Sequence, residues 1–512
     1  MNQIREYNAA TVMVDANVEK GWGDKPAFID ADRTLTYAQL QRATCQVANM
    51  LTALGVGREA RVAMLMHDTV AYPAVFWGAI RAGIVPVCLN TLLTAEQYRY
   101  MLVDSRAQVL IVSAPLLEVV GPLLDDLPAI GHVIVDGGDG AHPRLAELMA
   151  EASDTFETAP THPDETAFWL YSSGSTGAPK GVRHVHTSPQ YIADTYGRNV
   201  LGIRHDDVCF SAAKMFFAYG LGASMALPMS VGATTVLLAG RPTPASVLEM
   251  LSRHDPTLFF GVPTLYAAML ADEKCTRQSG SARLRLCVSA GEALPEDIGR
   301  RWEARMGVPI LDGIGSTEML HVFLSNRPDD IRYGTSGRAF EGYKLRLVDE
   351  EGRDVPDGEL GELLVSGDSA GDGYWNQRAK SRATFQGEWV RTGDKYTRDS
   401  EGYYHYCGRT DDMFKVSGRW TSPFEVEQAL VAHEAVLEAA VVAHHEGDGL
   451  IKPKAFVILV EGRAPSEDLF QELKDHVKEA VGVWKYPRWI EVLDELPKTA
   501  TGKIQRFKLR RC

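Results

Sequence analysis

The stretch Tyr171-Ser-Ser-Gly-Ser-Thr-Gly-Ala-Pro-Lys-Gly-Val182 combines glycines, hydroxyl side chains and a lysine within a few positions. It follows Ala167-Phe-Trp-Leu170, a short apolar run that predicts a buried strand. Glycines let a backbone approach an anion closely, backbone amides and hydroxyls surround phosphate oxygens, and a lysine adds positive charge. The spacing is not that of a P-loop, because Pro179 precedes Lys180 and Gly181 follows it. We therefore interpret the stretch as a different phosphate-binding loop, with a flexible surface loop as the alternative.

Length and charge narrow the class of protein. At 512 residues the chain is too long for one hydrophobic core, so we expect at least two domains. The net charge of −14 argues against non-specific nucleic-acid binding, although a locally basic site could still hold an anionic substrate. Seven cysteines without a CxxC pair predict neither a disulfide framework nor a zinc site, and they favour a reduced cytosol.

The sequence predicts no export signal and no membrane span. The first six residues are polar and charged, which is not the pattern of a signal peptide. Residues 70–89 are the most apolar region, but Arg81 and Pro86 interrupt it. We expect a buried helix and strand there instead of a membrane-spanning helix.

Short apolar strands alternate with helical patterns up to about residue 320, which predicts parallel, doubly wound sheets. Thr36 with Gln39 forms a capping-box pattern that starts the first helix, and Gly55 ends it. The other expected helices are 72–82 and 96–103, and the expected strands are 61–66, 84–89, 109–112, 234–238, 257–260 and 285–288.

The pattern of residues changes in the last third of the chain. From about Gly334 glycine becomes dense, and the runs 343–348 and 362–365 predict hairpins in a β-rich subdomain. After Gly408, helices at 424–432 and 468–481 and strands at 436–442 and 455–460 predict a small α+β unit. We therefore predict an α/β protein whose large N-terminal domain, residues 1–408, combines doubly wound sheets with the β-rich subdomain. Residues 409–512 would form a small, mobile C-terminal lid domain.

The opening stretch resembles the phosphate-binding signature of the acyl-adenylate-forming superfamily. This superfamily contains acyl-CoA synthetases, peptide-synthetase adenylation domains and beetle luciferases. Further motifs match it in order, and together they extend over residues 25 to 506. The resemblance implies that the loop binds the phosphates of ATP through Ser172, Ser173, Gly174, Ser175, Thr176, Gly177 and Lys180.

Two further stretches resemble nucleotide motifs of the superfamily. Ser289-Ala-Gly-Glu-Ala293 is similar to the adenine-pocket segment, which implies roles for Ser289, Ala290, Gly291 and Glu292. Asp312-Gly-Ile-Gly-Ser-Thr-Glu318 is similar to the second nucleotide motif, which implies nucleotide contacts by Asp312, Gly313 and Ile314 and catalytic roles for Thr317 and Glu318.

In this second motif, Thr317 would bond phosphate oxygens and Glu318 would hold the Mg²⁺ that accompanies ATP. A hard cation prefers carboxylate and phosphate oxygens, so the residue type fits. The superfamily usually has tyrosine where Ile314 stands, which leaves aromatic stacking on adenine open. A loop with a helix-capping threonine and a glutamate is the alternative interpretation.

The remaining motifs lie toward the C-terminus. By the resemblance, Asp394 would accept hydrogen bonds from the ribose hydroxyls, and Arg409 would contact the ribose or the phosphates. Asp411 would be the hinge about which the last hundred residues rotate, although Arg409 and Asp411 alone would also fit a surface ion pair. Lys503 would be catalytic, because one anion attacking another needs a cation where the charge concentrates.

Residues 212–222 and 320–326 resemble those of benzoate–CoA and hydroxybenzoate–CoA ligases most closely. Phe217 falls where these enzymes have an aromatic gate between the carboxylate and the thiol tunnel. The positions that would line the aryl pocket are Phe217, Ala218, Tyr219, Gly315, His321 and Val322. A flat, apolar pocket with one or two polar tips suits an aromatic acid. Ordinary apolar core is the alternative, with His321 as a structural histidine.

The resemblance implies a ligase that joins a small aromatic carboxylic acid to coenzyme A with ATP and Mg²⁺, in aromatic acid degradation. Ala218 and Val322 leave an apolar slot, so benzoate is favoured over hydroxybenzoate. A peptide-synthetase adenylation domain, a luciferase-like oxygenase and a non-catalytic nucleotide-binding regulator are the rival interpretations. We expect a cytoplasmic protein with neither nucleic-acid nor membrane partners, and a homodimer is one open candidate for its assembly.

Overall fold

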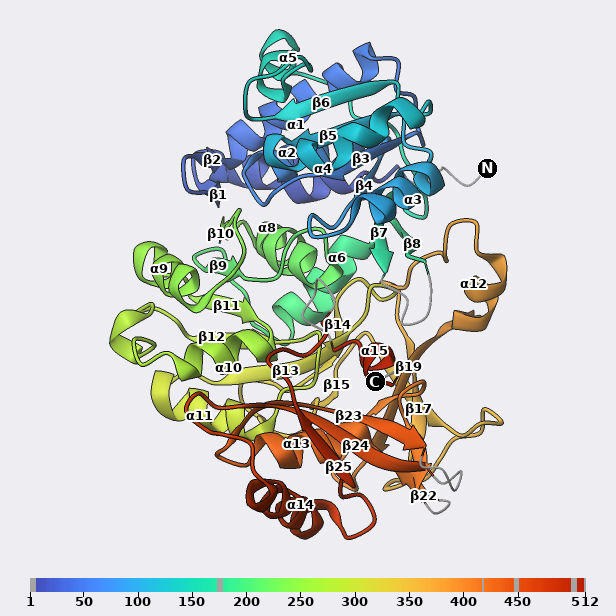
Figure 1. The fold of residues 1–512 in the computed structure, drawn as a ribbon. Helices are drawn as coiled ribbons and strands as arrows, with labels where there is room; N and C mark the ends of the chain where they lie inside the picture. The colour runs from blue at the N-terminus through green and yellow to red at the C-terminus, as the bar shows by residue number, and fades with distance from the viewer. Residues whose placement is uncertain (1–5, 173–177, 417–418, 446–450, 499–503, 511–512) are drawn as a thin grey trace.

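The computed structural model describes residues 6–172, 178–416, 419–445, 451–498 and 504–510. Its sheets follow one another along the molecule, from blue N-terminal strands through green central strands to orange and red C-terminal strands (Figure 1). The α/β class that the alternation of strands and helices predicts is confirmed.

The first sheet is parallel except at one edge. Among the described residues its strand order is β6 (His132–Asp136), β5 (Val109–Ser113), β3 (Arg61–Leu65), β4 (Val85–Cys88), β7 (Thr166–Ser172) and β8 (Lys180–Val185). Among these described strands, β8 alone runs antiparallel to its neighbour, β7.

Helices cover both faces of this sheet, as the predicted doubly wound arrangement requires. In β3, Val62 and Met64 pack with α1 (Tyr37–Ala53) and α2 (Ala71–Arg81), whereas Ala63 and Leu65 pack with the face that holds α3 (Ala95–Ser105). Successive side chains of a strand point to opposite faces, so a strand covered on both sides is apolar throughout. This explains the uninterrupted apolar run of the sequence.

The second sheet holds most of the central part of the chain. Among the described residues its order is β15 (Arg338–Ala339), β14 (Val322–Ser325), β13 (Ile310–Gly315), β12 (Leu286–Ser289), β11 (Leu258–Gly261), β9 (Val208–Ser211), β10 (Thr234–Val236), β1 (Pro26–Ile29) and β2 (Thr34–Thr36). The pairs from β13 to β1 are parallel, and β2, β14 and β15 add antiparallel edges. The sequence predicted parallel sheets, and these edge strands and β8 differ from that prediction because they pair antiparallel.

The predicted β-rich subdomain is an antiparallel sheet. It contains β16 (Lys344–Val348), β17 (Gly361–Ser366), β18 (Phe385–Gln386), β19 (Trp389–Arg398) and β20 (Tyr404–Arg409). The C-terminal part follows with β21 (Phe414–Val416) paired to β22 (Arg419–Thr421), and with a sheet of β23 (Val436–His445), β24 (Ile451–Leu459) and β25 (Trp489–Val492). The predicted boundary between residues 408 and 409 falls inside β20, just before its last residue.

The remaining α-helices connect and cover these sheets. They are α4 (Leu117–Val120), α5 (Leu145–Glu151), α6 (Ser188–Ile192), α7 (Ala218–Leu221), α8 (Leu227–Val231), α9 (Pro244–His254), α10 (Pro263–Ala271), α11 (Glu296–Met306), α12 (Arg378–Thr384), α13 (Pro423–Val431), α14 (Glu467–Val481) and α15 (Arg506–Leu509). Across the described ranges, no helix combines the length and the apolar character that crossing a membrane requires.

Local signals placed the first helix correctly. The Thr36 side chain accepts a hydrogen bond from the Gln39 backbone, and the Gln39 side chain accepts one from the Thr36 backbone. This reciprocal pair satisfies two amide donors that a helix start otherwise leaves unpaired. Gly55 follows the helix with a φ of 80°, a conformation that glycine adopts without strain.

A buried ion pair ties the N-terminal segment to α2. The Arg81 guanidinium, 3% exposed, donates to both carboxylate oxygens of Asp15 at 2.6 and 3.0 Å and to Thr44 Oγ1 at 3.0 Å. Removing one partner of such a pair leaves a charge buried without compensation.

We therefore predict that Asp15→Ala lowers the free energy of unfolding by about 3–5 kcal/mol. Asp126→Ala is the control, because its pair with Arg99 is solvent-exposed and should contribute about 0–1 kcal/mol. Urea unfolding of both variants measures the difference, and equal losses would contradict a special role for the buried pair.

Candidate active site

The predicted nucleotide motifs follow the carboxyl ends of parallel strands in two different sheets. Ser172 ends β7 in the first sheet, while Ser289 ends β12 and Gly315 ends β13 in the second sheet. In open α/β sheets, ligands bind outside these ends, because the strands stop there and loops with free polar groups begin. The fold therefore brings together motifs that are far apart in the sequence.

Glu318 lies where these loops meet. Its carboxylate oxygen Oε1 accepts hydrogen bonds from Ser172 Oγ at 3.3 Å and from the Tyr374 hydroxyl at 2.8 Å. Lys180 Nζ lies 3.7 Å from the same oxygen and donates to the Tyr374 hydroxyl at 3.2 Å. The predicted phosphate loop and the predicted metal ligand are thus in direct contact.

Burial and charge compete at this cluster. Burial by itself raises the pKa of the Glu318 carboxyl, but the Lys180 ammonium and the Tyr374 hydroxyl outweigh it and lower the pKa. Burial lowers the pKa of the Lys180 ammonium, and the Glu318 carboxylate counteracts part of that effect. Glu318 is therefore ionised at neutral pH, the form in which a carboxylate binds a cation.

His184 joins the two sheets behind the cluster. Its Nε2–H donates to the backbone carbonyl of Thr317 at 2.9 Å, and its side chain is fully buried. Burial lowers the pKa of the His184 imidazole to about 4, so the ring is neutral and can hold one tautomer. This bond fixes the backbone of the second nucleotide motif against β8.

One side-chain atom in each of the two predicted nucleotide motifs, on β12 and β13, is buried without a hydrogen-bond partner among the described residues. Ser289 and Asp312 are paired positions on β12 and β13, so their side chains lie on the same face of the sheet. Ser289 Oγ and Asp312 Oδ1 lack hydrogen-bond partners among the described residues. Burial raises the pKa of the Asp312 carboxyl well above its ordinary value. Unpaired polar atoms at such a position fit a site that a polar ligand completes.

Arg409, predicted to contact the ribose or the phosphates, binds Asp394, the predicted ribose contact. Asp394 on β19 and Arg409 on β20 are paired positions, and Arg409 Nη1 donates to Asp394 Oδ1 at 3.0 Å and to the Thr392 carbonyl at 2.8 Å. The Asp394 carboxylate raises the pKa of the Arg409 guanidinium. These hydrogen bonds of Arg409 reach across the sheet from β20 to β19.

The predicted aryl-pocket residues lie together around α7. Tyr219 and His321 have ring centroids 5.6 Å apart, and His321 Nε2 donates to the Tyr219 carbonyl at 3.2 Å. The Tyr219 hydroxyl lies 3.1 Å from the Val288 carbonyl and 3.2 Å from the Gly261 carbonyl. A hydroxyl has one proton to donate, so these backbone acceptors already satisfy it.

His321 is fixed in one protonation state and one tautomer. Burial lowers the pKa of its imidazole to about 3, and Nε2 carries the proton because a carbonyl can only accept. Nδ1 is therefore an acceptor, and it is buried without a partner in the described part of the chain. A Cβ at Gly222 would lie 2.2 Å from His321 Cδ2, so only glycine fits beneath the ring.

The other pocket residues are close to these two rings. Gly315 and Val322 are paired positions on β13 and β14, and a Cβ at Gly315 would lie 2.5 Å from the His321 carbonyl. Ala218 begins α7 and is buried, while Phe217, immediately before it, is half-buried against Phe216 with ring centroids 4.4 Å apart. β13 ends at Gly315 in the predicted aryl pocket, and the chain reaches Thr317 and Glu318 within the next three residues.

Several predicted residues lie outside the described ranges. They are Ser173, Gly174, Ser175, Thr176 and Gly177 of the phosphate loop and the catalytic candidate Lys503. Ala290, Gly291, Glu292, Gly313 and Ile314 are described and flank the buried pair on β12 and β13.

Sequence reasoning missed Tyr374. The segment that carries it, residues 371–384, crosses both predicted motifs: the Gly371 amide donates to the Glu318 carbonyl at 2.8 Å, and Tyr374 forms a β-bridge with Val182. Gly371 and Gly373, close together before an aromatic pair, were the only local signal.

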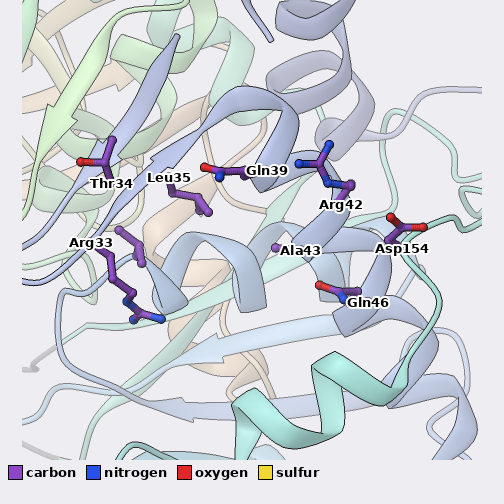
Figure 2. Close-up of a pocket in the computed structure, with 9 residues that line it drawn as sticks. Arg33, Thr34, Leu35, Gln39, Arg42, Ala43, Gln46 and Asp154 are labelled. Carbon is purple, nitrogen blue, oxygen red and sulfur yellow. The ribbon is translucent and has the colours of Figure 1, made fainter. Parts of the chain in front are cut away.

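A cavity of about 440 Å³ lies elsewhere, between β2, α1 and the segment around Asp154 (Figure 2). None of its lining residues is a predicted site residue. They are Arg33, Thr34, Leu35, Gln39, Arg42, Ala43, Gln46, Val70 and Asp154.

Comparison with known proteins agrees with this arrangement. Residues 15–375 match the family described as AMP-binding enzyme, and residues 425–503 match the AMP-binding enzyme C-terminal domain. The chain is 56% identical to the 4-hydroxybenzoate–CoA/benzoate–CoA ligase of Rhodopseudomonas palustris, over 99% of this chain and 94% of that protein. It is 55% identical to the benzoate–CoA ligase of Thauera aromatica, over 98% and 96% of the two chains.

A solved structure extends the likeness to three dimensions. The benzoate CoA ligase from Burkholderia xenovorans LB400 superimposes with a TM-score of 0.92 at 49% identity, covering 98% of this chain and 100% of that one.

The low pKa of His321 predicts a pH dependence of stability. The unfolded chain takes up a proton on this residue near its ordinary pKa of about 6.5, whereas the folded chain does so only near 3. Lowering the pH from about 6.5 toward 3 therefore favours unfolding, by about 1.4 kcal/mol per pH unit for this residue.

His321→Gln keeps an N–H donor for the Tyr219 carbonyl but removes the titration, so the stability of this variant should fall less steeply with decreasing pH. The buried, non-titrating Met319→Leu is the control and should keep the wild-type slope. Urea unfolding between pH 7 and pH 4 gives the slopes, and identical slopes for His321→Gln and wild type would refute the assignment.

Proposed function

The chain belongs to the AMP-binding enzyme family, and on that premise we propose how its residues carry out an aryl–CoA ligase reaction. It is an AMP-forming acid–thiol ligase of the benzoate–CoA ligase type, with ATP and coenzyme A as co-substrates. A carboxylate is a poor electrophile because oxide is a poor leaving group, so the acid must first be activated.

The reaction has two steps. In the first, a carboxylate oxygen of the acid attacks the α-phosphorus of ATP, and pyrophosphate leaves as the aryl-adenylate forms. In the second, the sulfur of coenzyme A attacks the acyl carbon, the bond to AMP breaks, and the thiol proton goes to solvent. The work of the protein in the first step is to position two anions and to balance their charge.

One observation carries the proposal: the few residues that follow β13 connect the aryl pocket to the phosphate cluster. Gly315 lies beside His321, and Glu318, three residues later, contacts Ser172 and Lys180. An acid whose ring lies beside His321 would have its carboxylate directed toward the phosphate loop. This is the arrangement that attack on an α-phosphate needs.

The cluster fits Mg²⁺ bound together with ATP. The described residues contain no group of three or more His, Cys, Asp or Glu side chains that could hold a metal alone. Mg²⁺ commonly uses one or two carboxylates together with substrate phosphates, and the ionised, half-buried Glu318 is suited to that role. When bound, the ion would neutralise charge on the phosphates, while Lys180 and Thr317 hold phosphate oxygens.

The pocket favours benzoate. The Tyr219 hydroxyl is satisfied by backbone carbonyls, so it does not require a ring hydroxyl, and Ala218 and Val322 are apolar. A second candidate acid rests on His321 Nδ1, a buried acceptor that has no partner among the described residues and to which a ring hydroxyl could donate. Hydroxybenzoate is therefore the alternative.

The C-terminal residues supply the remaining parts of the proposal. Lys503 brings a cation between the acid carboxylate and the α-phosphate, and residues 409–512 act as a lid with its hinge at Asp411. Two contacts join the C-terminal residues to the proposed hinge. Arg510 Nη2 donates to the Asp411 carbonyl at 3.1 Å, and Arg506 Nη1 lies 3.5 Å from Asp412 Oδ2. Hinges absorb a large backbone change at a few residues, which lets one face serve two half-reactions.

We expect the enzyme to use benzoate and small substituted benzoates with similar kcat/KM values. An apolar pocket distinguishes two substrates that differ by one methylene by only about 1–3 kcal/mol of transition-state binding. The measurement is kcat/KM for thioester formation from benzoate, the three hydroxybenzoates and octanoate. A hydroxybenzoate preferred by orders of magnitude would contradict the choice of benzoate, and octanoate as the best acid would contradict the aryl pocket.

Lys503→Ala should lower the rate of adenylate formation about a hundredfold or more. The variant should still form thioester from preformed benzoyl-adenylate. The two half-reactions are measured separately, with Lys508→Ala as the control for loss of a lysine in the same region. Equal loss in both half-reactions would contradict a role for Lys503 that is specific to adenylation.

A further inference from the structure

The Tyr374 hydroxyl stands between the cation and the anion of the phosphate cluster. Lys180 Nζ donates to it at 3.2 Å, and it donates to Glu318 Oε1 at 2.8 Å. The Lys180 ammonium also lies over the Tyr374 ring, 4.4 Å from its centroid. Tyr374 is 4% exposed, so its hydroxyl is oriented by these partners and not by bulk water.

The backbone around Tyr374 is held on both sides of the site. Tyr374 forms a β-bridge with Val182, and the Trp375 amide donates to the Gly181 carbonyl at 2.8 Å, so the residue is fixed to β8. The Gly371 amide donates to the Glu318 carbonyl at 2.8 Å and fixes the segment to the second motif. Phe385 packs against the Tyr374 ring with centroids 5.3 Å apart.

The three side chains around Glu318 are not equivalent once ATP binds. By the proposed function, the Lys180 ammonium has phosphate oxygens as competing partners, and Ser172 belongs to the phosphate loop itself. Tyr374 carries no charge that would draw it to the phosphates, and it lies on a different segment from the phosphate loop. Its bond to Oε1 can therefore persist while Lys180 turns to the phosphates.

We propose that Tyr374 is a positioning residue that holds the Glu318 carboxylate by Oε1 so that the carboxylate can accept the Mg²⁺ of MgATP. The inference rests on the proposed function, since it takes Glu318 as the metal ligand. In this proposal Tyr374 acts through Glu318 and contacts neither the acid nor the reacting phosphorus. A hydrogen bond to a charged group is among the stronger ones in proteins, and it also restricts the orientation of its acceptor.

Tyr374→Phe deletes one oxygen and keeps the ring that contacts Lys180 and Phe385. We expect the Kd for ATP in the presence of Mg²⁺ to rise about tenfold, and the Mg²⁺ concentration at half-maximal activity to rise similarly. The Kd for ATP in the presence of EDTA should change less than twofold. Titration calorimetry without acid or coenzyme A measures both constants, so failure of the acid assignment would leave this test intact.

Tyr343→Phe is the matched control. Its hydroxyl is also buried and bonded, to Ser369 Oγ at 2.9 Å, but it lies outside the cluster. It should change neither constant. A second test combines Tyr374→Phe with Glu318→Ala, where the tyrosine change should add less than twofold because its acceptor is gone.

Two results would overturn the proposal. If Tyr374→Phe weakens ATP binding equally with and without Mg²⁺, the hydroxyl acts on the nucleotide or on Lys180 and not through the metal ligand. If the Mg²⁺ dependence is unchanged, or if the full effect persists in the Glu318→Ala background, Tyr374 does not position Glu318.

Discussion

The ionised carboxylate of Glu318 is the group on which the rest of the site depends. A half-buried charge costs free energy unless other groups compensate it, and here Lys180, Ser172 and Tyr374 do so at a single oxygen. Ser172 and Lys180 come from the phosphate loop stretch and Tyr374 from the 371–384 segment, while Glu318 belongs to the second nucleotide motif. The need to compensate one charge therefore holds the phosphate loop, the second nucleotide motif and the 371–384 segment together, and function and stability share the same contacts.

The doubly wound fold makes this convergence possible. Parallel strands place all their carboxyl ends at one edge, and two sheets contribute their edges to the same region, β7 from one sheet and β12 and β13 from the other. The buried, neutral His184 connects them through the Thr317 carbonyl. The predicted aryl pocket uses the same edge, so only the short segment after β13 separates Gly315 in that pocket from Glu318 in the phosphate cluster.

Local patterns in the sequence predicted several elements of the fold and the motifs of the site. Features that depend on contacts between distant residues were not predicted. The strand before Ser172 and the capping pair at Thr36 depend on neighbouring residues, so their patterns are visible in the chain. Tyr374 is separated from Glu318 by 56 residues, and its role depends on a contact that no local pattern encodes. The pairing of Arg409 with Asp394 likewise depends on the register of β19 and β20, which the sequence did not reveal. The antiparallel β8 was missed because it begins inside the glycine-rich stretch.

The central claim is that the phosphate cluster and the aryl pocket together form an adenylation site. Exchange of labelled pyrophosphate into ATP in the presence of Mg²⁺, without coenzyme A, measures the first step alone. The account predicts that benzoate supports this exchange and that its omission abolishes it. Binding of ATP with no benzoate-dependent exchange would contradict the account and would indicate a nucleotide-binding protein without ligase activity.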